Sequence, residues 1–374
     1  MRKLLLFLLC LLLTACAAPA PQAADGPEFS TLQQTGSLEL QYATQFSVDF
    51  YEGGYAAISV EDGNRYLLVP ENAPVPAKLD ADLTVLQQPL DHIYLVATSA
   101  MDMYRAVDGI GNIRLSSLQS KDWAVEEARL AMERGEILYA GKYNVPDYEL
   151  LFAENCDLAV ESTMIYHAPE VKEQLERLGV PVFVERSSYE KNPLGRIEWI
   201  KLHGLLVGRL GEAERRFREE LDALAPVMAA EQTGKRVAFF SISPVGYVTV
   251  RRPGDYIARA IEMAGGQYAL ADIEAGESNS PTMNLQMEAF YAAAKDADIL
   301  IYSATIADPL STMDQLLSLS PAMKDFRAVR SGDVWCTEQN VFQQSMGIGG
   351  LLLDFHRVFA EEAPEGLTHL HKLS

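Results

Sequence analysis

The interval of residues 193–232 most constrains the fold, because it has no strand pattern and separates two regions in which strands alternate with helices. Its helical periodicity predicts one long connecting helix, with Gly204, Gly208 and Gly211 as points where it bends or breaks. The periodic apolar positions are Ile197, Ile200, Leu205, Val207, Leu210, Phe217, Leu221 and Leu224. The chain is therefore expected to fold as two units, one on each side of this helix.

Both flanking regions follow the order strand, helix, strand, which predicts parallel α/β layers. Before the connecting helix, strands are expected at 93–97, 156–160 and 180–185, and helices at 124–134 and 169–178. After it, strands are expected at 236–242, 298–302 and 333–336, and helices at 255–264, 287–294, 312–317 and 349–362. The chain length also favours two cores over one. We place the N-terminal lobe at 37–192, the connecting helix at 193–232 and the C-terminal lobe at 233–374.

An additional β-rich segment opens the first unit. Turn sequences such as Glu52-Gly53-Gly54 and Asp62-Gly63-Asn64 separate its short runs, and this combination predicts a β-meander. The runs lie at 38–43, 46–51, 55–60 and 66–69.

The N-terminus has the pattern of a secretion signal. Arg2 and Lys3 precede an apolar run at 4–13, which is too short to span a membrane. The run ends in Leu13-Thr14-Ala15-Cys16, which resembles the lipobox of bacterial lipoproteins. That resemblance implies cleavage of a signal peptide at 1–15, lipid attachment at Cys16, and a location on the outer face of the cell membrane. An ordinary cleaved signal with an incidental Cys16 is the alternative.

Residues 16–36 are expected to form a flexible tether, because they are rich in Ala, Pro, Gln and Gly and lack periodic hydrophobicity. The folded part is then expected to begin near Ser37. No later stretch is long and apolar enough to span a bilayer.

The chain is strongly acidic, with a formal net charge of −21. Loss of the signal would remove two basic residues and no acidic ones, so the charge argues against nucleic acid as a partner. Cys156 and Cys336 are the cysteines that remain beyond the tether, and both adjoin apolar strands. They are expected to be buried small side chains, and a disulfide scaffold is excluded.

Several short sequence motifs, taken in their order along the chain, resemble those of the periplasmic binding proteins of ABC importers for iron complexes, haem and cobalamin. In the first lobe they lie at 139–143, 146–151, 156–160 and 171–182. In the second lobe they lie at 254–257, 261–266, 284–290, 298–301, 326–329 and 332–335. The resemblance covers about residues 85–360. The β-rich segment 38–84, the helix that follows Ser120-Lys121-Asp122-Trp123 and the entry to the connecting helix at 193–199 depart from the family pattern.

The resemblance implies two Rossmann-like α/β lobes joined by a long rigid connecting helix, here preceded by the β-meander. It further implies a monomer without an intrinsic cofactor that captures an iron complex (siderophore or haem) or cobalamin between its lobes. The partners would be an ABC permease and its ATPase.

Two other functions were weighed. An enzyme is disfavoured, because the sequence has no Gly-x-Ser-x-Gly and the glycines at 347–350 lack the context of a nucleotide-binding loop. A protein for a bare transition metal would need about three converging His or carboxylate ligands. His167 is the one histidine in a loop that could reach a cleft, so bare-metal binding stays as the alternative.

A large planar or chelated ligand calls for aromatic and polar side chains in loops that follow strands. Arg251 and Arg252 precede Pro253-Gly254-Asp255, so two guanidinium groups would meet a helix N-terminus, which suits carboxylates, phosphates or catecholates. Surface salt bridges for the arginines and core positions for the aromatics are the alternatives. The candidates are Ser99, Met101, Trp123, Tyr143, Thr163, Met164, His167, Tyr247, Arg251, Arg252, Thr305 and Phe342.

Glu149 and Glu288 each stand at the start of a predicted helix, one in each lobe. The resemblance implies that these two carboxylates form salt bridges with arginines of the permease. Alternatively, each glutamate only complements the dipole of its own helix, a contribution of roughly 0.3 to 1 kcal/mol.

Overall fold

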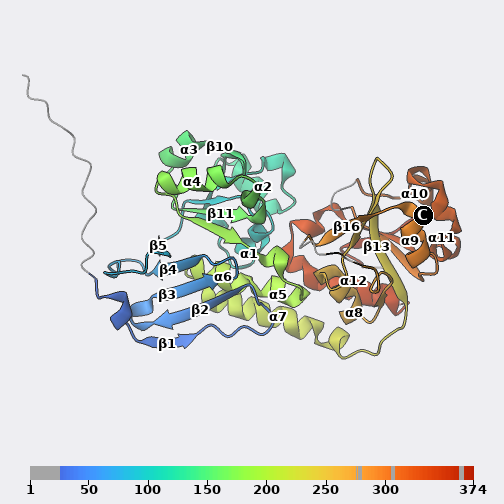
Figure 1. The fold of residues 1–374 in the computed structure, drawn as a ribbon, viewed down its shortest axis with the longest axis horizontal. Helices are drawn as coiled ribbons and strands as arrows, with labels where there is room; N and C mark the ends of the chain where they lie inside the picture. The colour runs from blue at the N-terminus through green and yellow to red at the C-terminus, as the bar shows by residue number, and fades with distance from the viewer. Residues whose placement is uncertain (1–25, 275, 277–279, 305–307, 362–365) are drawn as a thin grey trace, which may run out of the picture.

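The computed structural model describes residues 26–274, 276, 280–304, 308–361 and 366–374. The signal, Cys16 and the first part of the tether lie outside the described residues. Figure 1 shows an N-terminal sheet at the lower left, an N-terminal lobe above it and a C-terminal lobe on the right. Within the described ranges, no helix has the length and apolarity that a membrane span requires.

The N-terminal sheet has the strand order β1-β2-β3-β4-β5. Its first four strands form the predicted antiparallel meander, and β5 adds to β4 in parallel. The first strand differs from the prediction, because it lies at 34–37 and not at 38–43, so ordered structure begins before Ser37. The strands are β1 Gln34–Ser37, β2 Phe46–Tyr51, β3 Ala56–Val60, β4 Arg65–Val69 and β5 Leu83–Gln87.

The N-terminal lobe is built on a parallel sheet with the order β12-β11-β6-β7-β8. Buried β-rich segments form its strands, as expected for a sheet covered on both faces. The strands are β6 Ile93–Leu95, β7 Ile113–Ser116, β8 Leu138–Tyr139, β11 Leu158–Ser162 and β12 Val182–Glu185. A short hairpin consists of β9 Gly141–Lys142 and β10 Val145–Pro146. The helices are α1 Ala100–Ala106, α2 Glu126–Glu133, α3 Tyr148–Ala153 and α4 Pro169–Arg177.

The connecting segment is three helices and not the single rigid helix that was predicted. They are α5 Pro193–Glu198, α6 Ile200–Leu206 and α7 Leu210–Met228. Gly208 has a φ of 71°, a left-handed conformation that ends α6 and reverses the chain. A Cβ at Gly204 would lie 2.6 Å from the Cβ of Ala213, so this glycine lets α6 pack closely on α7. The 19 residues of α7 run below both lobes toward the C-terminal lobe (Figure 1).

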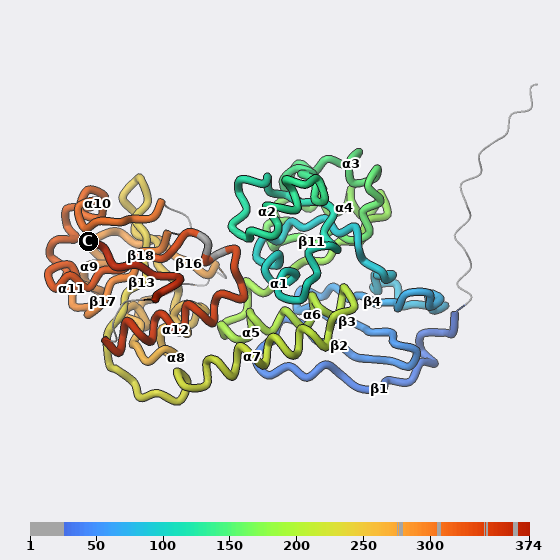
Figure 2. The backbone as a smooth tube through the Cα atoms, turned by 180° about the vertical axis from the view of Figure 1, so that it is seen from behind, coloured from blue at the N-terminus to red at the C-terminus, as the bar shows by residue number. Residues whose placement is uncertain are grey.

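The C-terminal lobe contains a mixed sheet with the order β16-β14-β13-β17-β18-β19, and β15 pairs with β13. Parallel pairs join β13, β17 and β18, whereas β14, β16 and β19 pair antiparallel. The strands are β13 Arg236–Ile242, β14 Val248–Arg251, β15 Gln267–Tyr268, β16 Thr282–Leu285, β17 Ile299–Tyr302, β18 Val334–Thr337 and β19 Leu370–Lys372. The helices are α8 Tyr256–Met263, α9 Met287–Ala294, α10 Met313–Leu319, α11 Arg327–Ser331 and α12 Ile348–Phe359. Seen from behind in Figure 2, α12 packs against α7.

Two buried carboxylates fasten the N-terminal sheet to the connecting helices. Glu198 accepts hydrogen bonds from the backbone N–H groups of residues 41–43 at 2.8 to 3.1 Å and pairs with Lys201 at 2.7 Å. Glu190 accepts the N–H groups of Thr44 and Gln45 at 2.9 Å and the indole N–H of Trp199 at 3.0 Å. The loop between β1 and β2 is thus held by side chains about 150 residues later in the chain.

A short segment of the C-terminal lobe is hydrogen-bonded to the N-terminal lobe. The Ser345 hydroxyl donates to the Ser99 carbonyl at 2.8 Å, and the Met346 N–H donates to Asp102 at 2.9 Å. Gln343 accepts the Ala124 N–H at 2.7 Å. The segment before α12 therefore joins the lobes at the start of α1 and the loop before α2.

Candidate ligand-binding site

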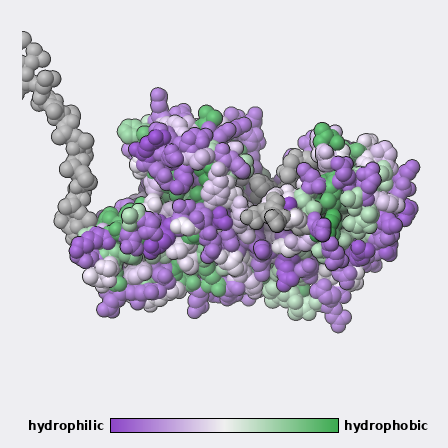
Figure 3. Space-filling model, viewed as in Figure 1, coloured by the Kyte–Doolittle hydropathy of each residue, from purple (hydrophilic) through white to green (hydrophobic). Residues whose placement is uncertain are grey.

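The candidate site lies where the carboxyl ends of the parallel strands face the junction of the lobes. In open α/β sheets, ligands bind in the crevice outside these ends. Ser99, just beyond β6, already touches the C-terminal lobe. The space-filling view in Figure 3 shows the surface hollowed between the two lobes.

On the N-terminal side, three side chains form a cluster that we call the rim cluster: Tyr166, Arg186 and Tyr189. They follow the adjacent strands β11 and β12. One guanidinium nitrogen of Arg186 donates to the Tyr166 hydroxyl at 3.0 Å, and the group lies 4.4 Å from the Tyr189 ring centre. The two tyrosines are 42% and 38% exposed, so their rings are accessible to a ligand.

The rim cluster brings the guanidinium group of Arg186 close to the Tyr166 hydroxyl, which in turn donates to the Asp62 carboxylate at 2.8 Å. The buried Nε of Arg186 and the Ser187 hydroxyl have no hydrogen-bond partner among the described residues. Burial and the hydrogen bond to Asp62 raise the pKa of Tyr166 to about 12, so its phenol stays neutral. The described residues therefore leave part of the hydrogen-bonding capacity of the Arg186 guanidinium group unused.

On the C-terminal side, Arg251 differs from the expectation. The N-terminus of α8 is capped by Asp255, which accepts the Ile257 N–H at 2.9 Å and lies 3.7 Å from the Arg251 guanidinium. The predicted anion position is therefore filled by the chain's own carboxylate. Arg252 donates to the Thr282 carbonyl at 3.3 Å, and its buried Nη1 has no partner within the described part of the chain.

Arg196 of α5 is a basic residue that the sequence reasoning missed. It is only 6% exposed, and its guanidinium carbon lies 4.1 Å from the centre of the Tyr256 ring, which Arg251 also approaches at 5.2 Å. The Nε of Arg196 finds no partner in the described ranges. Arg196 thus ties the connecting helices to α8 beside the other arginines.

The remaining predicted ligand residues divide by exposure. Met101 and Trp123 are corrections, because both side chains are buried in the core and the Trp123 indole donates to the Ser116 hydroxyl at 3.1 Å. Thr305 and the side chain of Phe342 lie outside what the structure describes. Exposed side chains are Met164, His167 and Tyr247, and half-buried ones are Ser99, Tyr143 and Thr163.

Grooves of the described structure lie elsewhere. One, of about 770 Å³, is lined by α8 and β15 side chains, among them Arg259 and Tyr268. Another, of about 490 Å³, is lined by α1 and α7 side chains, among them Arg105, Arg216 and Glu220. A third, of about 440 Å³, shares part of this second lining. None of the predicted ligand residues lines any of these three grooves.

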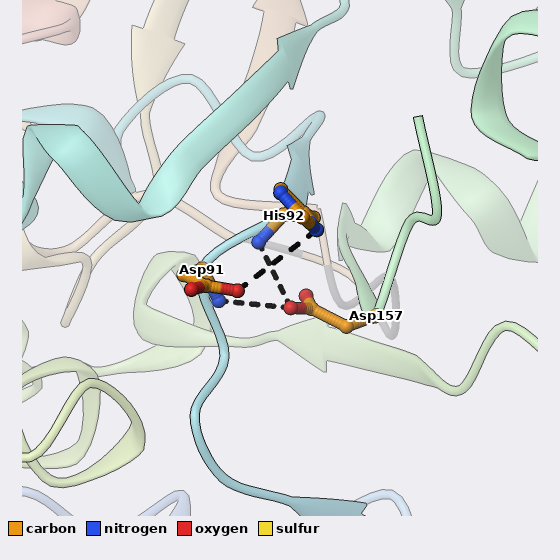
Figure 4. Close-up of side chains that lie close together, drawn as sticks. All are labelled: Asp91, His92 and Asp157. Atoms are coloured by element: carbon orange, nitrogen blue, oxygen red, sulfur yellow. Dashed lines mark hydrogen bonds and ion pairs between the residues drawn. The ribbon is translucent and has the colours of Figure 1, made fainter. Parts of the chain in front are cut away.

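One potential metal-ligating group occurs in the described structure, formed by Asp91, His92 and Asp157 (Figure 4). Asp157 accepts the backbone N–H groups of Asp91 and His92, each at 2.8 Å. It precedes β11, whereas the other two precede β6, so the trio lies at the amino ends of these strands, away from the rim cluster. These bonds give Asp157 a structural role in joining the two strands.

Glu149 and Glu288 occupy equivalent positions. Each is exposed and is the second residue of its helix, α3 and α9 respectively. Exposure in the first turn of a helix fits both permease docking and the alternative in which each glutamate only complements the dipole of its own helix. Their role remains a prediction.

Comparison with known proteins agrees with this architecture. No family model matches the chain. Two uncharacterized lipoproteins of Methanocaldococcus jannaschii are similar in sequence. One is 22% identical over 317 residues, covering 81% of this chain and 74% of the relative. The other is 23% identical over 355 residues, covering 91% and 87%.

Solved structures with the same fold are periplasmic binding proteins. A periplasmic haem-binding protein from Pseudomonas aeruginosa has a TM-score of 0.56 at 16% identity, covering 76% of this chain and 98% of its own. A protein of an ABC-type Fe3+-hydroxamate transport system from Saccharomonospora viridis has a TM-score of 0.54 at 18% identity, with 72% and 93% covered. The vitamin B12 binding protein of Vibrio cholerae has a TM-score of 0.50 at 14% identity, with 73% and 99% covered. The chain thus has the two-lobe fold of these transport proteins.

Proposed function

We propose that this protein is an extracytoplasmic, lipid-anchored binding protein of an ABC importer, and that it captures an anionic iron complex, either haem or a siderophore, between its lobes. Cobalamin is the neighbouring possibility within the same fold. Cys16 would carry the anchor, and a permease with its ATPase would receive the ligand.

The observation that supports this proposal is a set of three arginines with unused hydrogen-bonding capacity. Arg186, Arg196 and Arg252 each contain a buried N–H without a partner in the described structure. A guanidinium group gains most from an anion where water is largely excluded. In a chain of net charge −21, three such groups favour a ligand that brings negative charge.

Titration of the purified mature protein with haemin, ferric enterobactin (an anionic catecholate siderophore complex) and cyanocobalamin tests the proposal, since all three absorb visible light. We expect micromolar or tighter binding of at least one iron complex. Arg186→Gln and Arg252→Gln should each weaken it about tenfold, the effect of one charged hydrogen bond. Arg259→Gln is the matched control, because Arg259 is exposed and pairs with Glu262 on the surface. The absence of binding by all three probes would contradict the proposal.

Bare-metal binding is tested on the same preparation. The metal content of protein purified without added ligand distinguishes an ion held by side chains from a complex held as a whole. Stoichiometric zinc, manganese or iron without a chelator would favour the alternative function.

A further inference from the structure

The N-terminal sheet reaches the rim cluster through the turn between β3 and β4. Asp62 in this turn accepts the Tyr166 hydroxyl at 2.8 Å. The same carboxylate accepts the backbone N–H of Asn64 at 3.0 Å and the Asn64 side-chain amide at 2.7 Å. The turn therefore fixes the Asp62 carboxylate before it meets Tyr166, and the phenol has a preset partner.

A second contact from the sheet holds the other half of the cluster. The side-chain oxygen of Gln45 accepts a guanidinium N–H of Arg186 at 3.3 Å. The Gln45 backbone N–H donates to the buried Glu190 at 2.9 Å, and its carbonyl accepts the Glu61 N–H at 3.0 Å. The loop that carries Gln45 and the turn that carries Asp62 are thus joined to each other and to the connecting helices.

This arrangement leaves the rim cluster little freedom. The Tyr166 hydroxyl donates a hydrogen bond to Asp62 and accepts one from Arg186. The Arg186 guanidinium also donates to Gln45 and lies over the ring of Tyr189. Side chains that are already held by hydrogen bonds within the protein lose less conformational entropy when a ligand binds to them. Without the sheet, a tyrosine and an arginine on two exposed loops would sample many rotamers.

We propose that the N-terminal sheet is part of the ligand-binding apparatus, with Asp62 and Gln45 as positioning residues for Tyr166 and Arg186. This inference rests on the proposed function and deepens it. The solved binding proteins match over 90% or more of their own length but over only 72 to 76% of this chain. Part of this chain therefore lies outside each match, and on this proposal the sheet contributes to this chain's own specificity. The positioned groups suit a ligand with an oxyanion beside a flat or chelated surface.

A double-mutant cycle tests the inference. The variants are Asp62→Ala, Tyr166→Phe and the two combined, with Asp82→Ala as the control. Asp82 belongs to the same sheet but only pairs with Arg65 on the surface, where its side chain is 58% exposed. Each protein is titrated with haemin, ferric enterobactin and cyanocobalamin, and its melting temperature is measured.

For each probe that the wild type binds, we expect Asp62→Ala and Tyr166→Phe each to weaken binding about three- to tenfold, and Asp82→Ala to change nothing. Because Asp62 acts through the phenol, it should have no further effect once Tyr166 is phenylalanine. If Asp62→Ala weakened binding only by loosening the turn, the loss of affinity would be the same whether residue 166 is tyrosine or phenylalanine. That result would overturn the inference. Unchanged affinity in both single variants would overturn it as well. If the wild type binds none of the probes, the proposed function itself fails.

Discussion

Two regions of the molecule each bury a glutamate completely. One is the junction between the N-terminal sheet and the connecting helices, and the other is the interior of the N-terminal lobe. At the junction, Glu198 is met by backbone N–H groups and by Lys201. In the lobe, both carboxylate oxygens of Glu161 on β11 have no partner among the described residues, and burial raises the pKa of this side chain to about 8. Burial alone therefore does not define the role of a carboxylate. The donors let Glu198 join two parts of the chain, whereas Glu161, which has no donor in the described structure, is mainly neutral at pH 7.

The largest effect on stability should come from removing the Glu198 carboxylate. Glu198→Ala removes the acceptor of several part-buried backbone N–H groups and leaves the Lys201 ammonium with the Glu39 carbonyl as its remaining acceptor, so we expect a loss of about 3 kcal/mol in the free energy of unfolding. Urea denaturation measures it. Glu219→Ala, on the exposed face of α7, is the control and should change little. A small loss for Glu198→Ala would show that water replaces the carboxylate there.

Glu161 should make the stability of the folded protein depend on pH. Its pKa in the folded protein lies above that of an unfolded glutamate, so the folded state binds the extra proton and stability falls as pH rises from about 4.5 to 8. The slope should reach about 1.4 kcal/mol per pH unit, and Glu161→Gln should remove it. Denaturation across this range measures the slope. Glu173→Gln on the exposed face of α4 should retain it, and an unchanged slope in Glu161→Gln would mean that Glu161 has a partner.

His203 of α6 sharpens the comparison, because it lies near the junction yet resembles Glu161. Neither ring nitrogen has a partner in the described structure, and burial lowers its pKa to about 3. Its folded pKa lies below the unfolded value, so stability should be lost as pH falls below about 6.5. His203→Phe should remove that loss and add about 1 kcal/mol at pH 6. His356→Phe should destabilise instead, because the His356 ring bonds the Ala264 carbonyl at 3.1 Å.

The exposed carboxylates should matter least to stability. Glu149→Arg combined with Glu288→Arg should leave the melting temperature and ligand affinity unchanged, because exposed charges govern encounter and orientation. Uptake of the bound ligand by cells that contain the cognate importer should fail. Glu173→Arg combined with Glu214→Arg provides a control with the same change in charge. Normal uptake by the folded Glu149/Glu288 variant would remove both residues from the docking surface.

Much of the fold could be predicted, because local patterns decided it. The strand at 236–242 and the helix at 287–294 occur as expected, since buried runs and helical spacing are local signals. Short elements such as α1 and β7, and the antiparallel strands β14 and β16, gave no such signal. The break at Gly208 was visible as a glycine, but the reversal of α6 onto α7 depends on packing against Ala213.

The candidate site could be predicted only in part. Loops after strands were the correct places to search, but sequence does not show which side chain in a loop turns inward. Trp123 is buried through its bond to Ser116, whereas Tyr166 is exposed because Asp62, 104 residues earlier, holds it. Arg186 follows β12 directly, and a basic residue at a strand end was the signal that could have found it. Arg196 was hidden in a segment interpreted as purely structural.

The bonds from Glu198 to the loop at 41–43 also bear on how the chain acquires its structure. They join groups 155 to 157 residues apart in sequence. An exported chain crosses the membrane from its N-terminus, so the first sheet emerges long before the acceptors that lock it. Contacts of such long range slow folding, and the waiting strands can pair wrongly with other chains. We therefore expect the N-terminal third to stay sensitive to proteases until residues 190–201 have been translocated, and extracytoplasmic chaperones to act during that interval.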